Sequence, residues 1–137
     1  MEAASGGRGE EAVVSQKTKP EIDFPGGEAP AELQIRDIVV GDGAEAKPGA
    51  NVEVHYVGVT FSTGEEFDAS WNRNSTFRFP LGGGRVIKGW DEGVVGMKVG
   101  GRRELIIPAN KAYGNQSPTP LIPAGSTLIF VVDLISV

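Results

Sequence analysis

From Arg85 to Met97 the chain reads RVIKGWDEGVVGM, a short amphipathic segment with a tryptophan near its centre. Its apolar residues recur every three or four positions, which predicts one short helix with a single apolar face. Gly89 and Gly93 lie inside this helix, where each costs about 1 kcal/mol relative to alanine. We therefore expect close packing against a sheet or a ligand at both glycines. The predicted apolar face comprises Ile87, Trp90, Val94 and Met97, and the predicted outward residues are Lys88, Asp91, Glu92 and Lys98.

Short strand signals fill much of the chain around this helix. Their β-branched and aromatic residues alternate with polar ones, and turns rich in glycine and proline separate them. A parallel α/β fold needs a helix between most strands, so one helix favours an antiparallel sheet wrapped across it. The polar run ASWNRNST, residues 69–76, is predicted to interrupt one strand as a bulge or flap. The expected strands are Leu33–Val40, Asn51–Phe61, Thr76–Leu81, Arg102–Ile107 and Ser126–Val137.

The 137 residues divide into two parts. Residues 1–30 are rich in Ala, Gly, Glu and Pro and are predicted to form a flexible arm, with Ile22 and Phe24 as its anchor points. Residues 31–137 are predicted to form the one folded domain. Residues 1–31 hold three basic and six acidic side chains, and residues 32–137 hold ten and twelve. A nearly neutral body without a basic stripe argues against nucleic acid as a partner.

Composition excludes several kinds of chemistry. The chain has no cysteine and a single histidine, His55, so we predict no metal site, no cofactor and no serine-hydrolase triad. We expect His55 to be a hydrogen-bonded structural residue on the strand face opposite Val52, Val54 and Tyr56. The N-terminal stretch has no secretory signal, and no window is apolar enough for a membrane span. We therefore expect a soluble, cytoplasmic protein with no membrane partner.

With those kinds of chemistry excluded, the aromatic side chains are the best candidates for a binding site. Strand alternation could turn Tyr56, Phe67 and Phe77 toward the helix, and Phe130 lies in the last strand. Two interpretations of Trp90 stay open at this point, the floor of an apolar pocket or the filler of an ordinary core.

A proline-rich loop, NQSPTPLIPAG at residues 115–125, follows Tyr113. Its apolar residues Leu121 and Ile122 either tuck under the body or border the candidate pocket.

Six blocks of sequence follow one another along the domain: HYVG at 55–58, FDAS at 67–70, FPLG at 79–82, VIKGWDEGVVGM at 86–97, AYG at 112–114 and IPAGSTLIFVVDL at 122–134. Together they resemble the FKBP-type peptidyl-prolyl cis-trans isomerases, most of all the single-domain bacterial members. The resemblance covers Leu33 to Val137. It implies an α+β fold, in which a five- to six-stranded antiparallel sheet curls around one short helix with a proline-binding pocket between them.

The resemblance also implies roles for individual residues. Trp90 is the floor under the prolyl ring, the backbone N–H of Ile87 binds the peptide, and Tyr113 donates its hydroxyl to a substrate carbonyl. Asp68 is the buried carboxylate near the reacting imide, and we also expect it to pair with Arg73. The catalytic set is Asp68, Tyr113, Trp90, Tyr56 and Phe130; the substrate-binding set is Phe67, Phe77, Val86, Ile87, Arg73 and the mobile rim residues Leu121 and Ile122.

The expected activity is isomerisation of X–Pro bonds in peptides and unfolded proteins, which assists their folding. Such bonds cross a barrier of about 18–20 kcal/mol without any covalent bond to the enzyme. The alternative is a non-catalytic module of the same fold that binds proline motifs or a partner. Tacrolimus and rapamycin are expected ligands, bound more weakly because Arg85 replaces an acidic residue of well-known members and Pro118 replaces a histidine.

Overall fold

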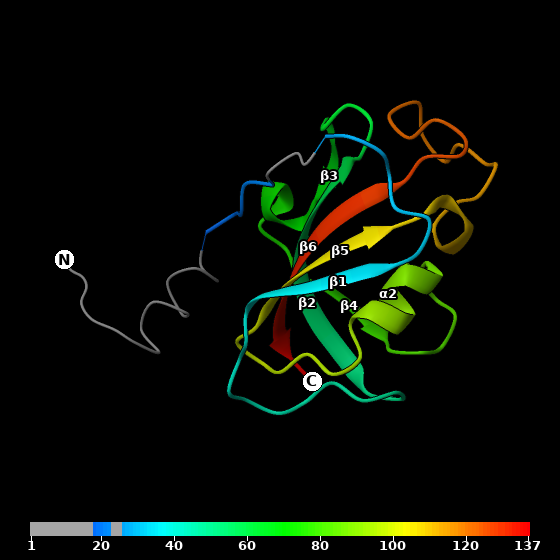
Figure 1. Cartoon of the computed structure of the whole chain (residues 1–137). Coiled ribbons are helices and arrows are strands. Elements are labelled where there is room, and N and C mark those ends of the chain that lie inside the picture. Colours follow the sequence, from blue (N-terminus) through cyan, green and yellow to red (C-terminus); the bar gives the residue numbers. More distant parts are fainter. Residues whose placement is uncertain (1–17, 23–25) are drawn as a thin grey trace.

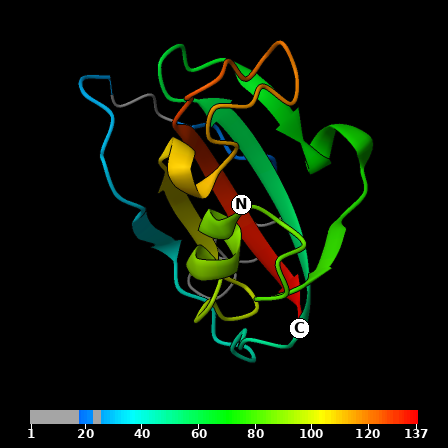
Figure 2. The same ribbon diagram turned by 90° about the vertical axis from the view of Figure 1, so that its right-hand side faces the viewer.

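The computed structural model describes residues 18–22 and 26–137. Their strands form one antiparallel sheet in the order β1-β5-β6-β2-β3, and β4 also pairs with β2. The helix α2 packs across one face of this sheet, which we call the inner face (Figures 1 and 2). The α+β architecture expected from the sequence is confirmed. The elements are β1 (Gln34–Val39), β2 (Asn51–Thr60), β3 (Glu66–Ala69), β4 (Phe77–Pro80), α2 (Lys88–Gly93), β5 (Arg102–Ile107) and β6 (Leu128–Ser136), with 3₁₀ helices at Ser70–Arg73 and Ala109–Lys111.

The predicted interruption of one strand is confirmed. β3 and β4 both pair with β2, Asp68 opposite Gly58 and Phe77 opposite Val54. The 3₁₀ helix Ser70–Arg73 leaves the sheet between them. Asn74 then takes a left-handed conformation with φ of 50°, which asparagine tolerates and which turns the chain back toward β4.

Close packing explains the two helix glycines. A Cβ added to Gly89 would lie 2.5 Å from the side chain of Ile107, and one added to Gly93 would lie 2.7 Å from that of Leu105. Both partners are fully buried residues of β5. Glycine therefore lets α2 approach the sheet more closely than any residue with a side chain could, as the sequence predicts.

The helix is shorter than the apolar spacing predicts. α2 has six residues, so Ile87 lies at its N-terminal cap and Met97 lies beyond its end. Arg103 of β5 donates hydrogen bonds to the backbone oxygens of Gly93 (2.8 Å) and Val95 (3.0 Å). These bonds satisfy carbonyls that a longer helix would have paired internally, so the chain can leave the helix early.

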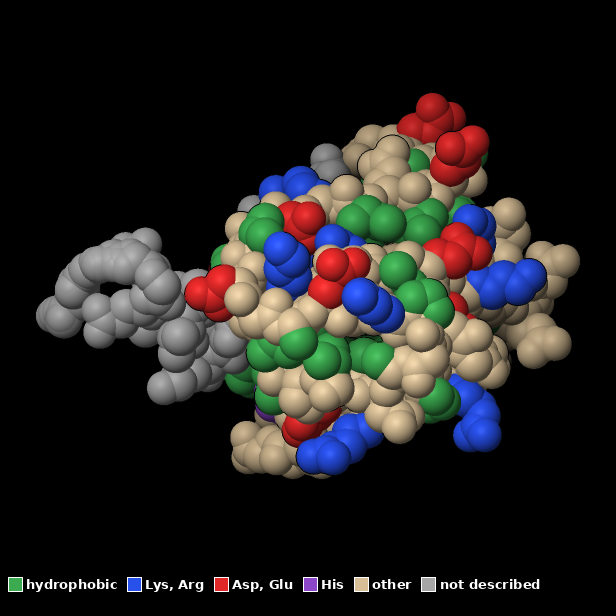
Figure 3. Space-filling view, turned by 90° about the horizontal axis from the view of Figure 1, so that it is seen from below, with side chains coloured by type: hydrophobic (Ala, Val, Ile, Leu, Met, Phe, Trp, Pro, Cys, Tyr) green, Lys and Arg blue, Asp and Glu red, His purple; other side chains and the backbone are tan. Residues whose placement is uncertain are grey.

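Hydrophobic alternation on β2 and β6 separates two cores. Val52, Val54 and Tyr56 lie in the main core on the inner face, together with Trp90 of α2. Residues of the opposite, outer face form a smaller cluster around Ile129. On the molecular face seen in Figure 3, hydrophobic side chains lie among acidic and basic ones rather than in a single broad patch. No helix in the described ranges has the length and hydropathy required to cross a membrane.

Residues 18–22 dock on the outer face. The carbonyl of Thr18 accepts a hydrogen bond of 2.9 Å from Arg102, and Lys19 forms an ion pair of 2.9 Å with Glu66. Ile22 packs against the outer cluster and is thus an anchor, as predicted. Residues 18–22 are therefore packed on the folded domain, whereas the sequence predicts a flexible arm over residues 1–30. Phe24, the second expected anchor, and residues 1–17 lie outside the described residues.

Candidate active site

A pocket of about 230 Å³ opens between α2 and the inner face of the sheet. Nine of the twelve residues predicted for the site line it, from segments as far apart in sequence as β2 and β6. Arg85 also lines it, while Arg73, Leu121 and Ile122 do not. The lining residues are Tyr56, Phe67, Asp68, Phe77, Arg85, Val86, Ile87, Trp90, Tyr113 and Phe130.

The indole of Trp90 lies at the centre of the aromatic cluster. Its ring centroid is 5.0 Å from that of Tyr56 and 5.2 Å from that of Phe130, and both pairs meet edge to face. Such contacts hold rings in fixed orientations. The indole N–H of Trp90 is buried and has no hydrogen-bond partner among the described residues. A buried tryptophan N–H normally has one, so this donor is unusual.

Gly58 makes room for two walls of the pocket, a role that the sequence analysis missed. A Cβ at Gly58 would lie 2.6 Å from the ring of Phe67 and 2.7 Å from that of Phe130. The two rings meet edge to face with centroids 5.5 Å apart. A glycine inside a strand signals a close approach by another group, and that signal was present in the HYVG block.

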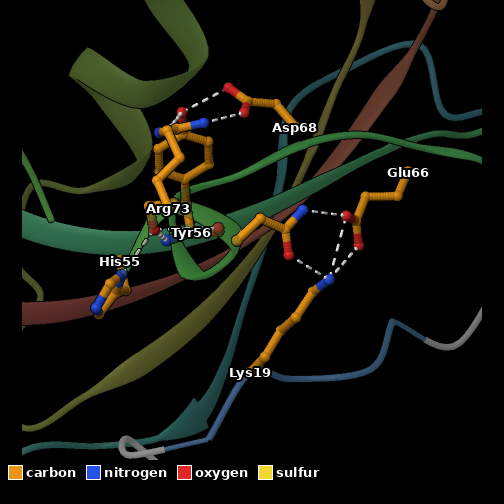
Figure 4. A network of polar contacts seen from close by, with 8 residues as sticks. Lys19, His55, Tyr56, Glu66, Asp68 and Arg73 are labelled. Carbon is orange, nitrogen blue, oxygen red and sulfur yellow. Dashed lines mark hydrogen bonds and ion pairs between the residues drawn. The ribbon is translucent and has the colours of Figure 1, made fainter. Parts of the chain in front are cut away.

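Asp68, Arg73 and Tyr56 form a closed polar network at one edge of the pocket (Figure 4). The Tyr56 hydroxyl donates to Asp68 Oδ2 at 2.6 Å, and Arg73 Nη1 donates to Asp68 Oδ1 at 2.6 Å. Arg73 Nη2 also donates to the Tyr56 oxygen at 2.9 Å. The expected ion pair is therefore present, and Arg73 contacts two lining residues although it does not line the pocket itself. The Asp68 side chain is 41% exposed, less buried than the resemblance implies.

The network fixes the protonation of its members. Burial raises the pKa of Asp68, but hydrogen bonds from Tyr56 and Arg73 outweigh burial and hold that pKa below its ordinary value. Burial and the bond to Asp68 raise the pKa of the Tyr56 hydroxyl. At neutral pH Asp68 is thus a carboxylate with its charge compensated, and Tyr56 remains a hydrogen-bond donor.

Tyr113 brings a free hydroxyl to the pocket. The residue follows the 3₁₀ helix Ala109–Lys111, which Lys111 ties to α2 through an ion pair of 2.5 Å with Glu92. Within the described residues the Tyr113 hydroxyl has no hydrogen-bond partner, and the residue is 39% exposed. Burial and the charge of Asp68 raise its pKa, so the hydroxyl stays protonated and can donate a hydrogen bond to a ligand.

Asp91 holds the loop that carries three lining residues. Its carboxylate accepts hydrogen bonds from the N–H groups of Gly82 (2.8 Å) and Gly84 (3.0 Å), which have φ of 82° and 73°. The expectation that Asp91 faces outward is thus wrong, because the glycine turn folds back over the first turn of α2. The run of three glycines before the helix was the available signal. The loop continues through residues 85–87, and the N–H of Ile87 has no acceptor in the described part of the chain.

The proline-rich loop separates its two apolar residues. Ile122 is 3% exposed and belongs to the main core, whereas Leu121 is 42% exposed. Ser117 holds the loop with hydrogen bonds of 2.8 Å to the carbonyls of Thr119 and Ile122. Only Ile122 therefore tucks under the body. A rim role for either residue stays a prediction.

His55 is hydrogen-bonded, as predicted. Its Nδ1 lies 2.7 Å from the hydroxyl of Ser70, which also accepts the N–H of Tyr56 at 2.7 Å. The imidazole stacks on Trp71, with ring centroids 4.1 Å apart. Burial lowers the pKa of His55, although the charge of Glu53 opposes this shift. His55 thus fastens the excursion between β3 and β4 to β2.

The pocket offers aromatic faces and hydrogen-bond donors. No group of three or more metal-ligating side chains is found in the described ranges. The Tyr113 hydroxyl and the Ile87 N–H can each donate to a carbonyl oxygen. A prolyl residue fits such a site, since its ring is apolar and its nitrogen carries no hydrogen that would need an acceptor.

Comparison with known proteins identifies relatives across this domain. The profile of the FKBP-type peptidyl-prolyl cis-trans isomerase family matches residues 43–135. The FK506-binding protein of Streptomyces anulatus is 65% identical over 120 residues, which cover 87% of this chain and 97% of that protein. A probable FK506-binding protein of Corynebacterium glutamicum is 60% identical, over 86% of this chain and 98% of the relative. The crystal structure of AtFKBP13 superposes with a TM-score of 0.70 at 39% identity, covering 79% of this chain and 94% of that one.

Proposed function

The chain belongs to the FKBP-type peptidyl-prolyl cis-trans isomerases, and from this premise we propose that its aromatic pocket is where the X–Pro bond rotates. One observation carries the proposal: hydrogen-bond donors that have no partner among the described residues lie among aromatic rings that leave room for a prolyl ring. A packed core would have satisfied those donors.

The proposed mechanism relies on exclusion of water. A planar X–Pro amide is charge-separated through resonance, and water stabilises it more than the twisted amide of the transition state. An apolar pocket withholds that stabilisation, so it raises the planar state relative to the twisted one. About 5.5 kcal/mol of such differential stabilisation would accelerate rotation roughly 10⁴-fold. No nucleophile is required.

The lining residues divide this work. Trp90 supports the prolyl ring from below, with Tyr56, Phe77 and Phe130 as walls. The Ile87 N–H and the Tyr113 hydroxyl hold carbonyl groups of the flanking peptide, so that rotation is confined to one bond. Asp68, with its charge compensated by Arg73, orients the Tyr56 hydroxyl at the edge of the pocket.

Isomerisation of a proline tetrapeptide tests these roles. Asp68→Val should lower kcat/KM, because it removes the acceptor that orients Tyr56. The matched control is Asp37→Val. Asp37 lies on β1, forms an ion pair with Arg103 of β5, and does not line the pocket. Equal activity in the wild type and Asp68→Val would contradict the role of Asp68. Wild-type protein that binds proline peptides without turnover would instead support the non-catalytic module.

We further propose that tacrolimus and rapamycin enter the same pocket, since several relatives are named as FK506-binding proteins. Trp71→Phe would leave Trp90 as the only tryptophan, because the chain has two. Its fluorescence should then change on macrolide addition, and the macrolide should compete with a proline peptide. A titration without competition would count against a shared pocket. Arg85 is expected to weaken this binding without abolishing it.

The natural task we propose is assistance to the folding of proline-containing proteins. Catalytic amounts of this chain should accelerate the refolding of a protein whose slow phase is proline isomerisation. Unchanged refolding alongside normal peptide turnover would restrict the enzyme to exposed peptides. The cytoplasmic location expected from the sequence stays a prediction, which cell fractionation would test.

A further inference from the structure

Arg85 carries the unmatched charge of the pocket. Its side chain is exposed, lines the pocket, and forms no ion pair or hydrogen bond with any described residue. The other charged lining residue, Asp68, is compensated by Arg73 at 2.6 Å. The pocket therefore presents one positive charge that no described residue compensates.

The acidic residues nearest in sequence are already engaged. The Asp91 carboxylate accepts two backbone N–H bonds from the glycine turn, and Glu92 pairs with Lys111 at 2.5 Å. Neither is within ion-pair distance of Arg85. Lys88, the next basic residue along the chain, is exposed and does not line the pocket.

The backbone beneath Arg85 is held in place while its side chain is free. Asp91 fixes the turn immediately before it, and the N-cap position of α2, Ile87, follows two residues after it. A peptide held by the Ile87 N–H would therefore pass within reach of the Arg85 guanidinium. A guanidinium can hold a carboxylate through two parallel N–H bonds, a geometry that neutral side chains cannot match.

We propose that Arg85 selects substrates in which an acidic residue lies within two positions of the isomerising proline. The inference rests on the proposed function of the pocket and names its preferred substrate class. Because the ion pair would be solvent-exposed, the expected preference is about two- to fivefold in kcat/KM over a neutral residue. It should weaken in about 1 M salt, which screens exposed charges.

The test compares peptides that differ at one position flanking an X–Pro bond. Glu, Gln or Lys is placed before the bond in one series and after it in the other, and cis-trans exchange is measured by NMR. This readout avoids a coupling protease whose own specificity would respond to the charge. The variants are Arg85→Gln and Arg85→Glu. Lys98→Gln is the matched control, since it removes one exposed positive charge outside the pocket lining.

Wild type and Lys98→Gln should prefer the Glu peptide over the Gln peptide in at least one series. In Arg85→Gln the ratio of kcat/KM for the Glu peptide to kcat/KM for the Gln peptide should fall to about one, and Arg85→Glu should favour the Lys peptide. No preference in wild type, or a preference that survives in Arg85→Gln, would overturn the proposal. Absence of turnover on every peptide would instead refute the proposed function, so the two failures are distinguishable.

Discussion

Two arginine–aspartate pairs meet at the same distance of 2.6 Å in opposite environments. Arg73 and Asp68 lie at the edge of the pocket with side chains 51% and 41% exposed, whereas Arg102 and Asp133 lie on the outer face with side chains 9% and 0% exposed. Burial raises the pKa of Asp133 to about 6 despite the bonds from Arg102, while the pKa of Asp68 falls below its ordinary value. Contact distance alone therefore does not reveal what an ion pair does.

The difference assigns separate tasks to the two faces. The buried pair ties β5 to β6 and, through Arg102, to the carbonyl of Thr18. The open pair orients Tyr56 at the edge of the pocket. Damage to the outer pair should thus appear in the stability of the fold, and damage to the pocket pair in turnover.

The largest expected effect is on the outer face. Arg102→Met leaves Asp133 buried without a partner and should lower the free energy of unfolding by about 3–5 kcal/mol. Arg73→Met should lower it by about 1 kcal/mol or less, since the pair is exposed. Urea unfolding of both variants measures the contrast. Adding Asp133→Leu to Arg102→Met should recover much of the lost stability. Equal losses of unfolding free energy in Arg102→Met and Arg73→Met would contradict the contrast between the two pairs.

The two aspartates should respond to pH with opposite signs. Asp133 has a folded pKa of about 6 against 3.8 in the unfolded chain, so its contribution to stability is greatest at low pH and is lost as pH rises through 6. Asp68 has a lowered folded pKa, so its contribution is present at neutral pH and is lost as pH falls below about 4.

Unfolding free energies measured from neutral pH down to about pH 2 test these signs. On going from pH 7 to 4, wild type should gain up to about 3 kcal/mol relative to Asp133→Asn. Below about pH 4 it should lose stability relative to Asp68→Asn, because the Asp68 carboxylate of the folded protein is then protonated. If the stability difference from wild type changed with pH in the same direction for both variants, the contrast between the buried and the exposed pair would be wrong.

Removal of residues 1–25 should have a smaller effect. It deletes the Thr18 bond, the Lys19 ion pair and the packing of Ile22, which together should cost about 1–2 kcal/mol. Peptide turnover should persist, because none of these residues lines the pocket. A chain that begins at Thr18 is the control and should keep full stability. Loss of turnover in the shorter chain would show that the two faces are coupled, through Lys19 and Asn72 beside Arg73.

The smallest expected change in stability accompanies a loss of activity. Tyr113→Phe removes a hydroxyl that has no partner among the described residues, so the unfolding free energy should change by less than about 1 kcal/mol. Turnover of a proline tetrapeptide should nevertheless fall. Thermal unfolding and isomerisation measured side by side decide the matter. Unchanged turnover in a clearly destabilised variant would remove Tyr113 from the site.

Much of the site was predictable, because its residues lie in sequence blocks that resemble those of the FKBP-type family and follow one another in the same order. Strand alternation indicated that Tyr56, Phe67 and Phe77 face the helix, and the resemblance supplied the roles of Trp90, Tyr113 and the N–H of Ile87. In the sequence Arg85 stands out only as a departure from the family, while the structure places it in the pocket lining. Asp91 was misassigned to solvent, because helical periodicity does not reveal a loop that folds back over the helix.

The sequence by itself determined the periodicities: one short apolar helix face, alternating strands, and glycines at Gly89 and Gly93 where a helix must approach a sheet. Only the tertiary structure decided which charges meet. Arg102 and Asp133 are 31 residues apart in sequence and become cross-strand partners through the register of β5 with β6. Thr18 reaches the same guanidinium from 84 residues away. Local patterns record which face of an element is apolar, but the partner of a buried charge depends on strand register, which no local pattern encodes.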